Sequence, residues 1–163
     1  MPDELEPPDP DLPIEDEFPV FPAAVKVAGA LWILFGGVLL LYLVFLLLVA
    51  FGVVAAPKPR FGLVEVCFDA VLGLIGTAFL SVGVQSVRGT ASDTLGSGIG
   101  SVPFGLFLLA GGVAGFWTNP IAAVVYLPSG AGMLVAGVLA LIGHRGYKAW
   151  RKAVWTRRKP DLR

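Results

Sequence analysis

The sequence predicts an all-α membrane protein, a four-transmembrane-helix bundle with an acidic N-terminal tail and a short basic amphipathic helix at the C-terminal end. The first observation is composition, because 56% of the 163 residues are hydrophobic and only 15% are charged. A soluble domain cannot bury that much apolar surface. The second observation is grouping, since the apolar residues form long runs that short polar breaks interrupt. Such runs are typical of helices that cross a bilayer.

Two spans are expected in the first half of the chain. The first covers about residues 23–56 and holds one charge, Lys26, near its start. It is longer than the roughly 20 residues that cross a hydrocarbon core, so helix tilt or an end projecting into the interface must absorb the excess. Pro57 and Pro59 break this run, because proline ends or kinks a helix. A second span follows at about residues 62–87.

A third span is expected at about residues 96–117. This run is rich in glycine and contains Pro103, and membrane helices tolerate both residue types better than soluble helices do. Ser92 or Asp93 is placed to cap the helix by accepting hydrogen bonds from its first free amides.

The fourth span is expected at about residues 120–143. Asn119 and Pro120 form a start signal, since proline at the first helical position gives up no hydrogen bond. Pro128 is expected to kink the helix. The alternative is a helix that begins only at Pro128.

Charge is segregated at the two ends of the chain. Residues 1–22 hold eight acids, seven prolines and no base, a composition that cannot offset the entropy of ordering, so we expect a disordered tail. Residues 144–163 hold eight of the twelve bases and one acid. The positive-inside rule places this basic tail in the cytoplasm. Four spans bring the N-terminus to the same side and leave only Lys58 and Arg60 outside.

Small residues recur at helical spacing within the expected spans. Lipid supplies no hydrophobic force between helices, so close backbone approach must hold them together, and small residues permit it. The stripes pack helices either within one bundle or in a homo-oligomer, and both interpretations stay open. These helix-packing positions are Gly73 with Thr77, Ser97 with Ser101 and Gly105, Gly111 with Gly115, and Gly132 with Ala136 and Ala140.

Glu65 and Asp69 are the acids that fall within an expected span. Four residues apart, they share one helical face. A charge held at mid-membrane costs roughly 2.5–3.5 kcal/mol and marks ion or proton pathways. The pair is therefore a candidate ion or proton site. The structural alternative is a carboxylate that snorkels to the interface or is paired.

The basic tail has an amphipathic pattern of its own. Aromatic and aliphatic side chains recur at i, i+3 and i+7, and bases occupy other faces. A helix of this kind lies on an anionic leaflet, where each base contributes about 1 kcal/mol. We expect anionic lipid head groups as the partner and no nucleic acid, with an acidic protein as the alternative. The membrane-surface anchor consists of Tyr147, Lys148, Trp150, Arg151, Lys152 and Val154.

The sequence contains no recognised catalytic motif. His144 is the single histidine and Cys67 the single cysteine, and no HExxH, Walker loop or nucleophile elbow is present. One cysteine excludes a disulfide or a thiolate metal cluster within the chain. We therefore expect no enzyme, and no catalytic, metal-binding or cofactor-binding residues.

In its pattern of spans and tails, the chain resembles the small multi-pass proteins of bacterial inner membranes. That resemblance implies a plasma-membrane location and carries no functional residue across. The first functional hypothesis is a noncatalytic scaffold, assembly factor or accessory subunit that packs its helices against itself or against a membrane protein partner. The alternative is a small transporter or channel subunit that uses Glu65 and Asp69.

Overall fold

The computed structural model describes residues 21–54, 63–117 and 119–157. The described residues form an all-α bundle of four helices, each long and apolar enough to cross a membrane. The helices are α1 (Ala23–Ala50), α2 (Leu63–Arg88), α3 (Thr94–Gly115) and α4 (Pro120–Arg157). The predicted fold class is therefore confirmed, and the composition of the helices indicates a membrane location. The predicted acidic tail lies outside the described residues, apart from its last two positions.

Glycines in the left-handed region end the first two helices. α1 ends at Ala50 rather than near residue 56, because Gly52 has a φ of 71° and the amide of Val53 donates to the Leu48 carbonyl at 2.9 Å. This 6→1 bond, with the amide of Gly52 bonded to the Val49 carbonyl, is a Schellman turn. Gly89, with a φ of 73°, ends α2 in the same way. The turn shortens the first span, whose excess length was expected to require tilt or a projecting end.

Side-chain caps fix where α3 and α4 begin. Asp93, one of the two expected caps, accepts a hydrogen bond from the Gly96 amide at 2.8 Å. Asn119 accepts one from the Ala122 amide at 3.2 Å, so α4 begins at Pro120 and contains Pro128. The backbone amides left free at a helix start are thus partly satisfied by these caps.

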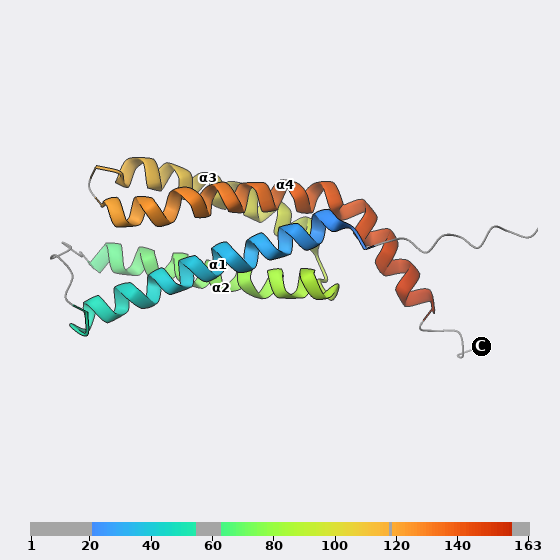
Figure 1. Ribbon diagram of the computed structural model, residues 1–163, viewed down its shortest axis with the longest axis horizontal. Coiled ribbons are helices and arrows are strands. Elements are labelled where there is room, and N and C mark those ends of the chain that lie inside the picture. The colour runs from blue at the N-terminus through green and yellow to red at the C-terminus, as the bar shows by residue number, and fades with distance from the viewer. Residues whose placement is uncertain (1–20, 55–62, 118, 158–163) are drawn as a thin grey trace, which may run out of the picture.

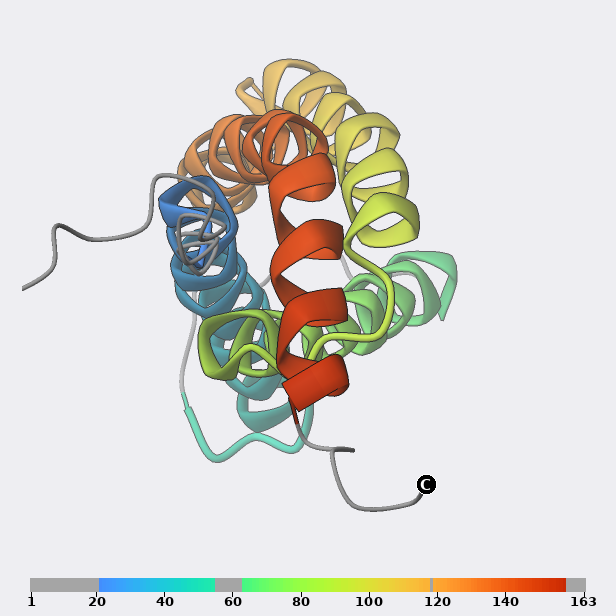
Figure 2. The same cartoon turned by 90° about the vertical axis from the view of Figure 1, so that its right-hand side faces the viewer.

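The last turns of α4 depart from the expectation of a separate helix. α4 continues to Arg157, whereas the sequence pattern predicted a span ending near residue 143 and a short helix after it. In Figure 1 these turns leave the long axis of the bundle, and Figure 2 shows them crossing its end. The chain therefore covers the end of the bundle where α1 starts and where α2 connects to α3.

The bundle consists of two antiparallel hairpins. α1 packs along α2, and α3 packs along α4, while contact between the hairpins is made mainly by α1 and α4. α2 and α3 have few close backbone approaches. Figure 1 shows the α1–α2 pair below the α3–α4 pair. The seam between α1 and α4 therefore holds the two halves together.

Glycines face one another across the α1–α2 hairpin. A Cβ on Gly83 would lie 2.7 Å from the Gly29 carbonyl oxygen, and a Cβ on Gly36 would lie 2.6 Å from the Gly76 carbonyl oxygen. Carbon and oxygen atoms in weak hydrogen-bond contact are usually about 3.3–3.6 Å apart, so only glycine fits. The two glycines on each helix are seven residues apart, which is two helical turns.

The α3–α4 hairpin repeats this arrangement. A Cβ on Gly105 would lie 2.7 Å from the Gly130 carbonyl oxygen, and a Cβ on Gly137 would lie 3.0 Å from the Gly98 carbonyl oxygen. The spacing on each helix is again seven residues. Both hairpins thus use two glycine pairs to bring their backbones together, as expected where dispersion contacts rather than hydrophobic transfer drive association.

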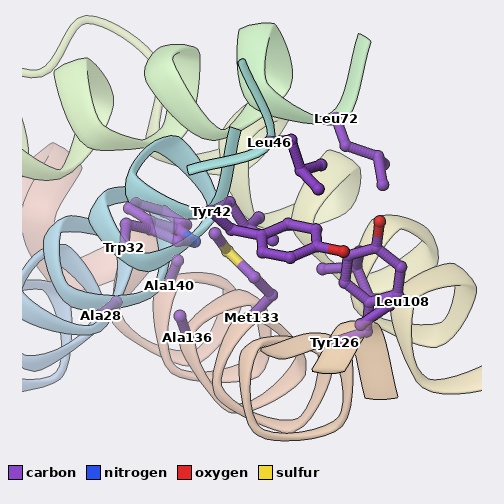
Figure 3. Packing of buried hydrophobic residues seen from close by; sticks show 12 residues of the cluster. Ala28, Trp32, Tyr42, Leu46, Leu72, Leu108, Tyr126, Met133, Ala136 and Ala140 are labelled. Atoms are coloured by element: carbon purple, nitrogen blue, oxygen red, sulfur yellow. The ribbon is translucent and has the colours of Figure 1, made fainter. Parts of the chain in front are cut away.

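The seam between α1 and α4 combines small residues with large rings. Trp32 and Ala136 are 0% exposed, and the Phe35 ring covers Gly132, leaving no room for a side chain there. Nearer the chain termini, Val25 packs against Gly143. Small α4 residues therefore let the large side chains of α1 enter, and Trp32 and Ala136 belong to the core drawn in Figure 3.

A buried hydrogen-bond chain crosses the same core. The Trp32 indole Nε1–H donates to the Ser101 Oγ at 3.0 Å, and the Ser101 hydroxyl donates to the Met133 carbonyl at 2.6 Å. Three helices, α1, α3 and α4, are joined by these two bonds. Each polar group is satisfied without water, which the hydrocarbon region of a membrane requires.

Candidate functional site

Asp69 lies at the junction between α2 and α4. The Tyr126 hydroxyl donates to the Asp69 Oδ1 at 2.5 Å, which is the short distance typical of a hydroxyl bound to a carboxylate. Asp69 stands six residues after the start of α2, or about 9 Å along the helix axis. The carboxylate is therefore near one end of the bundle, about two turns inside the helix.

Tyr42 brings α1 into the same polar group. Its ring packs edge to face against Tyr126, with ring centroids 5.7 Å apart, and its hydroxyl interacts with Tyr126 and with the Asn119 side chain. Figure 3 shows the two rings side by side, with Leu46 and Leu72 close to them. Side chains of α1, α2 and α4, together with the residue that caps α4, thus gather around one carboxylate.

The chemistry open to this polar cluster, made of Tyr42, Asp69, Asn119 and Tyr126, follows from its side chains. A carboxylate among hydroxyl and amide oxygens can exchange a proton or bind a cation, and it can also act only as a structural brace. The described residues contain no group of three or more His, Cys, Asp or Glu side chains that could hold a metal ion. Proton or cation binding would therefore depend on the oxygens of the cluster.

Glu65, the other acid of the candidate ion site, and the helix-packing pair Gly73 and Thr77 belong to the same helix as Asp69. The side chain of Glu65 lies outside the described part of the chain. Gly73, one turn after Asp69, packs against Leu43, and the Thr77 hydroxyl donates back to the Gly73 carbonyl at 2.9 Å. One turn after Asp69, the same face of α2 therefore packs against α1.

The expected packing residues divide into two groups. Gly105, Gly132, Ala136 and Ala140 lie at close helix contacts or in the core, and Ser101 belongs to the buried hydrogen-bond chain. Ser97 donates locally, from its hydroxyl to the Asp93 carbonyl.

Gly111 and Gly115 are different, because a Cβ on Gly115 would meet nothing within 4 Å in the described structure. A Cβ on Gly111 would meet only Tyr126, at an ordinary 3.8 Å. This GxxxG face is not a close contact within the chain, whereas Gly112 between the two packs against α4.

The expected membrane-surface anchor has its apolar face against protein. Tyr147 is 3% exposed, and its hydroxyl donates to the Ala91 carbonyl at 2.7 Å. Arg151 donates to the carbonyls of Ala91 and Ser92 at 3.2 and 2.9 Å. The expectation that this face lies on lipid is therefore wrong for Tyr147 and Arg151, since both bind the connection between α2 and α3.

The remaining members of the anchor lie around the same segment. Trp150 is half-buried, with its ring 5.9 Å from that of Tyr147, and Val154 is also half-buried. Lys148 and Lys152 are exposed. Nearby, the Thr94 hydroxyl and His144 Nδ1 are 3.0 Å apart, so the histidine also joins α4 to the start of α3.

Sequence reasoning missed the tyrosines of the polar cluster. The signal was present, because a tyrosine within a span needs a hydrogen-bond partner for its hydroxyl. Asp69 was the acid available to supply one, yet nothing local indicates that α2 meets α4. The pairing of Tyr126 with Asp69 depends on tertiary structure.

The fold and the cluster define a class, an integral four-helix membrane protein whose hairpins are joined by small residues and buried polar contacts. Comparison with known protein families, curated proteins and solved structures finds no match to this chain. The function is therefore argued from the contacts themselves.

Proposed function

We propose that the protein is a noncatalytic membrane component, a scaffold, assembly factor or accessory subunit that works through helix packing. The observation that carries this proposal is the use of Asp69, whose carboxylate accepts a hydrogen bond from Tyr126 across the two hairpins. Trp32 and Ser101 join helices in the same manner. Polar groups, whose placement in a membrane costs free energy, thus hold the bundle in one arrangement.

The outer face of α3 supports an interaction with a further helix. Gly98, Gly105 and Gly112 contact α4, while Gly111 and Gly115, on another side, make no close helix contact within the described residues. Small residues at i and i+4 let a second backbone come close. A second copy of the chain or a helix of a membrane protein partner would suit this face.

The proposed location is the bacterial inner membrane, with both termini in the cytoplasm. The start of α1 and the end of α4 lie at the same end of the bundle (Figure 1). In the described part of the chain, the exposed bases at this end include Lys26, Arg88, Arg145 and Lys148. The positive-inside rule supports placing that end in the cytoplasm.

The polar cluster supports a second candidate, a small transporter or channel subunit using Asp69 together with Glu65. Tyr42, Tyr126 and Asn119 supply oxygens around the carboxylate, as a proton or cation site would require. Because the cluster lies near one end of the bundle, a transported ion would reach it first from that side.

One experiment separates the two candidates. The protein is purified in mild detergent for light-scattering analysis of its mass, and reconstituted into liposomes for proton and cation flux. Asp69→Asn keeps an oxygen that can accept from Tyr126 but removes the charge. A packing protein gives no flux above empty liposomes, and the variant keeps its mass and fold.

Flux in the parent that disappears in Asp69→Asn would instead establish the transporter candidate. Asp93→Asn, at a helix cap outside the cluster, is the matched control and should leave both readouts unchanged. A strict monomer without flux would remove self-assembly as well, leaving a heteromeric partner.

A further inference from the structure

We propose that the acidic N-terminal segment, residues 3–17, docks on a basic face at the end of α4 and competes there with anionic lipid head groups. The basic face consists of Arg145, Lys148 and Lys152. The inference does not depend on the proposed function or on which side of the membrane this end faces, because Phe21, which follows the segment in the sequence, packs at the same end of the bundle as the basic face.

Aromatic contacts fix the point from which the acidic segment departs. The Phe21 ring packs edge to face against Trp150, with centroids 4.7 Å apart, and against Tyr147 at 5.6 Å. Pro22 lies against Gly146, at 3.2 Å from where a Cβ would stand. The chain preceding Phe21 is therefore joined through the backbone to a residue that packs on the last turns of α4.

The basic face is on the outer side of those turns. Arg145, Lys148 and Lys152 are spaced i, i+3 and i+7, so they share one side of the helix, and all three are exposed. Tyr147, on another side of the helix, binds the α2–α3 connection, and so does Arg151. Figure 2 shows this part of α4 crossing the end of the bundle.

Charge at this end is unbalanced in the described part of the molecule. Lys26 and Arg88 are also exposed there. The acid described at this end, Asp93, already caps α3 by accepting from the Gly96 amide. The described surface is therefore positive and attracts a nearby polyanion.

Residues 3–17 supply such a polyanion at short range. They contain eight acids and no base, and Glu17 is four residues from Phe21, a span of at most about 14 Å. Charges interact over a screening length of about 8 Å at physiological ionic strength. A short tether gives an effective concentration in the millimolar range, which favours this segment over a separate acidic protein.

Anionic head groups are attracted by the same bases. Whichever polyanion holds the basic face excludes the other. The acidic segment thus stays bound to the basic face in zwitterionic lipid. Anionic head groups displace it where anionic lipid is abundant.

The test uses the full chain in nanodiscs and a carbodiimide crosslinker, which joins a carboxylate to a lysine amine in contact with it. In zwitterionic lipid at low salt, we expect crosslinks from residues 3–17 to Lys148 and Lys152. Lys58, between α1 and α2 in the sequence, is an internal control and should remain uncoupled. Raising NaCl to about 1 M, where the screening length is about 3 Å, should reduce the yield about tenfold or more.

Anionic lipid should give a similar reduction at low salt, and an unchanged yield there would overturn the competition. The docking itself is overturned if the crosslinks to Lys148 and Lys152 are insensitive to salt or are matched by Lys58, or if they are absent in zwitterionic lipid and the distance measurement below also shows no docking. A variant with all eight acids of the segment changed to Asn or Gln should lose the crosslinks, and Asp161→Asn is its control.

A second measurement covers the case in which crosslinking geometry is unfavourable. Spin labels at Pro13→Cys and Ala149→Cys, in a Cys67→Ser background, report the distance between the segment and α4. The acidic segment should give a shorter and narrower distribution than the neutral variant. Identical distributions in zwitterionic lipid would overturn the docking.

Discussion

Replacing Gly105 by alanine should separate the backbones of the α3–α4 hairpin. The new Cβ would stand 2.7 Å from the Gly130 carbonyl oxygen and 2.8 Å from the Leu134 amide nitrogen. Relief to an ordinary carbon–oxygen distance of about 3.3–3.6 Å requires a local shift of about 0.6–0.9 Å. Both atoms belong to the backbone, so no side chain can rotate away, and the helices themselves must move.

The energetic consequence follows from that shift. Gaps of about 0.5–1 Å forfeit a quarter to a half of the dispersion energy of each atom pair that they separate, and overpacking a tight core costs about 1–3 kcal/mol. Gly100→Ala in the same helix is the matched control, because nothing lies within 4 Å of its Cβ position. There alanine gains up to about 1 kcal/mol from helix propensity. Because both variants gain the same helix propensity, they should differ by the overpacking cost alone, about 1–3 kcal/mol.

The assay is unfolding in mixed micelles by titration with sodium dodecyl sulfate, followed by far-ultraviolet circular dichroism. Gly105→Ala should unfold at a lower detergent fraction than the parent, and Gly100→Ala at an equal or higher one. Equal midpoints for the two variants would refute the reasoning, since the close approach at Gly105 would then carry no energetic weight.

Three further changes test the other contacts by the same titration. Tyr126→Phe removes the donor to Asp69 and should cost about 1–3 kcal/mol; a parent-like midpoint would contradict the brace. Trp32→Phe leaves the Ser101 hydroxyl bonded to its carbonyl acceptor, so about 1 kcal/mol should be lost, and no loss would show that the indole bond is dispensable. Gly52→Ala forces a side chain into the left-handed region at a cost of about 1–2 kcal/mol, whereas Gly52→Asn should be milder; the reverse order would count against the turn.

The number and approximate place of the spans could be predicted because bilayer insertion is a local, nearly additive property of apolar side chains. The ends of the spans were less predictable. The apolar run after Ala50 gave no sign of stopping, yet the Schellman turn at Gly52 stops α1 there. The backbone conformation of Gly52, rather than the hydropathy of the run, determines where α1 ends.

The four-residue spacing of small residues predicted only part of the helix interfaces. Stripes of small residues four apart pointed to Gly111 and Gly115, which make no close contact within the described chain, while the tight contacts recur every seven residues. An antiparallel pair with a seven-residue repeat keeps the same residues at the interface over successive turns. The repeat is visible in all four spans, as Gly29 and Gly36, Gly76 and Gly83, Gly98 and Gly105, and Gly130 and Gly137.

The polar cluster and the docked end of α4 lay beyond sequence reasoning for a common reason. Asp69 and Tyr126 are 57 residues apart, and Tyr147 and Ala91 are 56 apart. The amphipathic pattern of the C-terminal turns shows that one face needs cover. It does not say whether lipid or the rest of the chain supplies it.

The arrangement of two hairpins with one seam also bears on how the chain assembles during synthesis. All the glycine contacts between α1 and α2 precede α3 in the sequence, so this pair can close before α3 and α4 have left the ribosome. The second pair then closes on contacts that are equally local. Docking along the seam comes last, because it joins residues as distant as Val25 and Gly143, and non-local contacts of this kind form slowly. Until that step is complete, the large seam side chains of α1, such as Trp32 and Phe35, are open to lipid, to another nascent hairpin or to a chaperone.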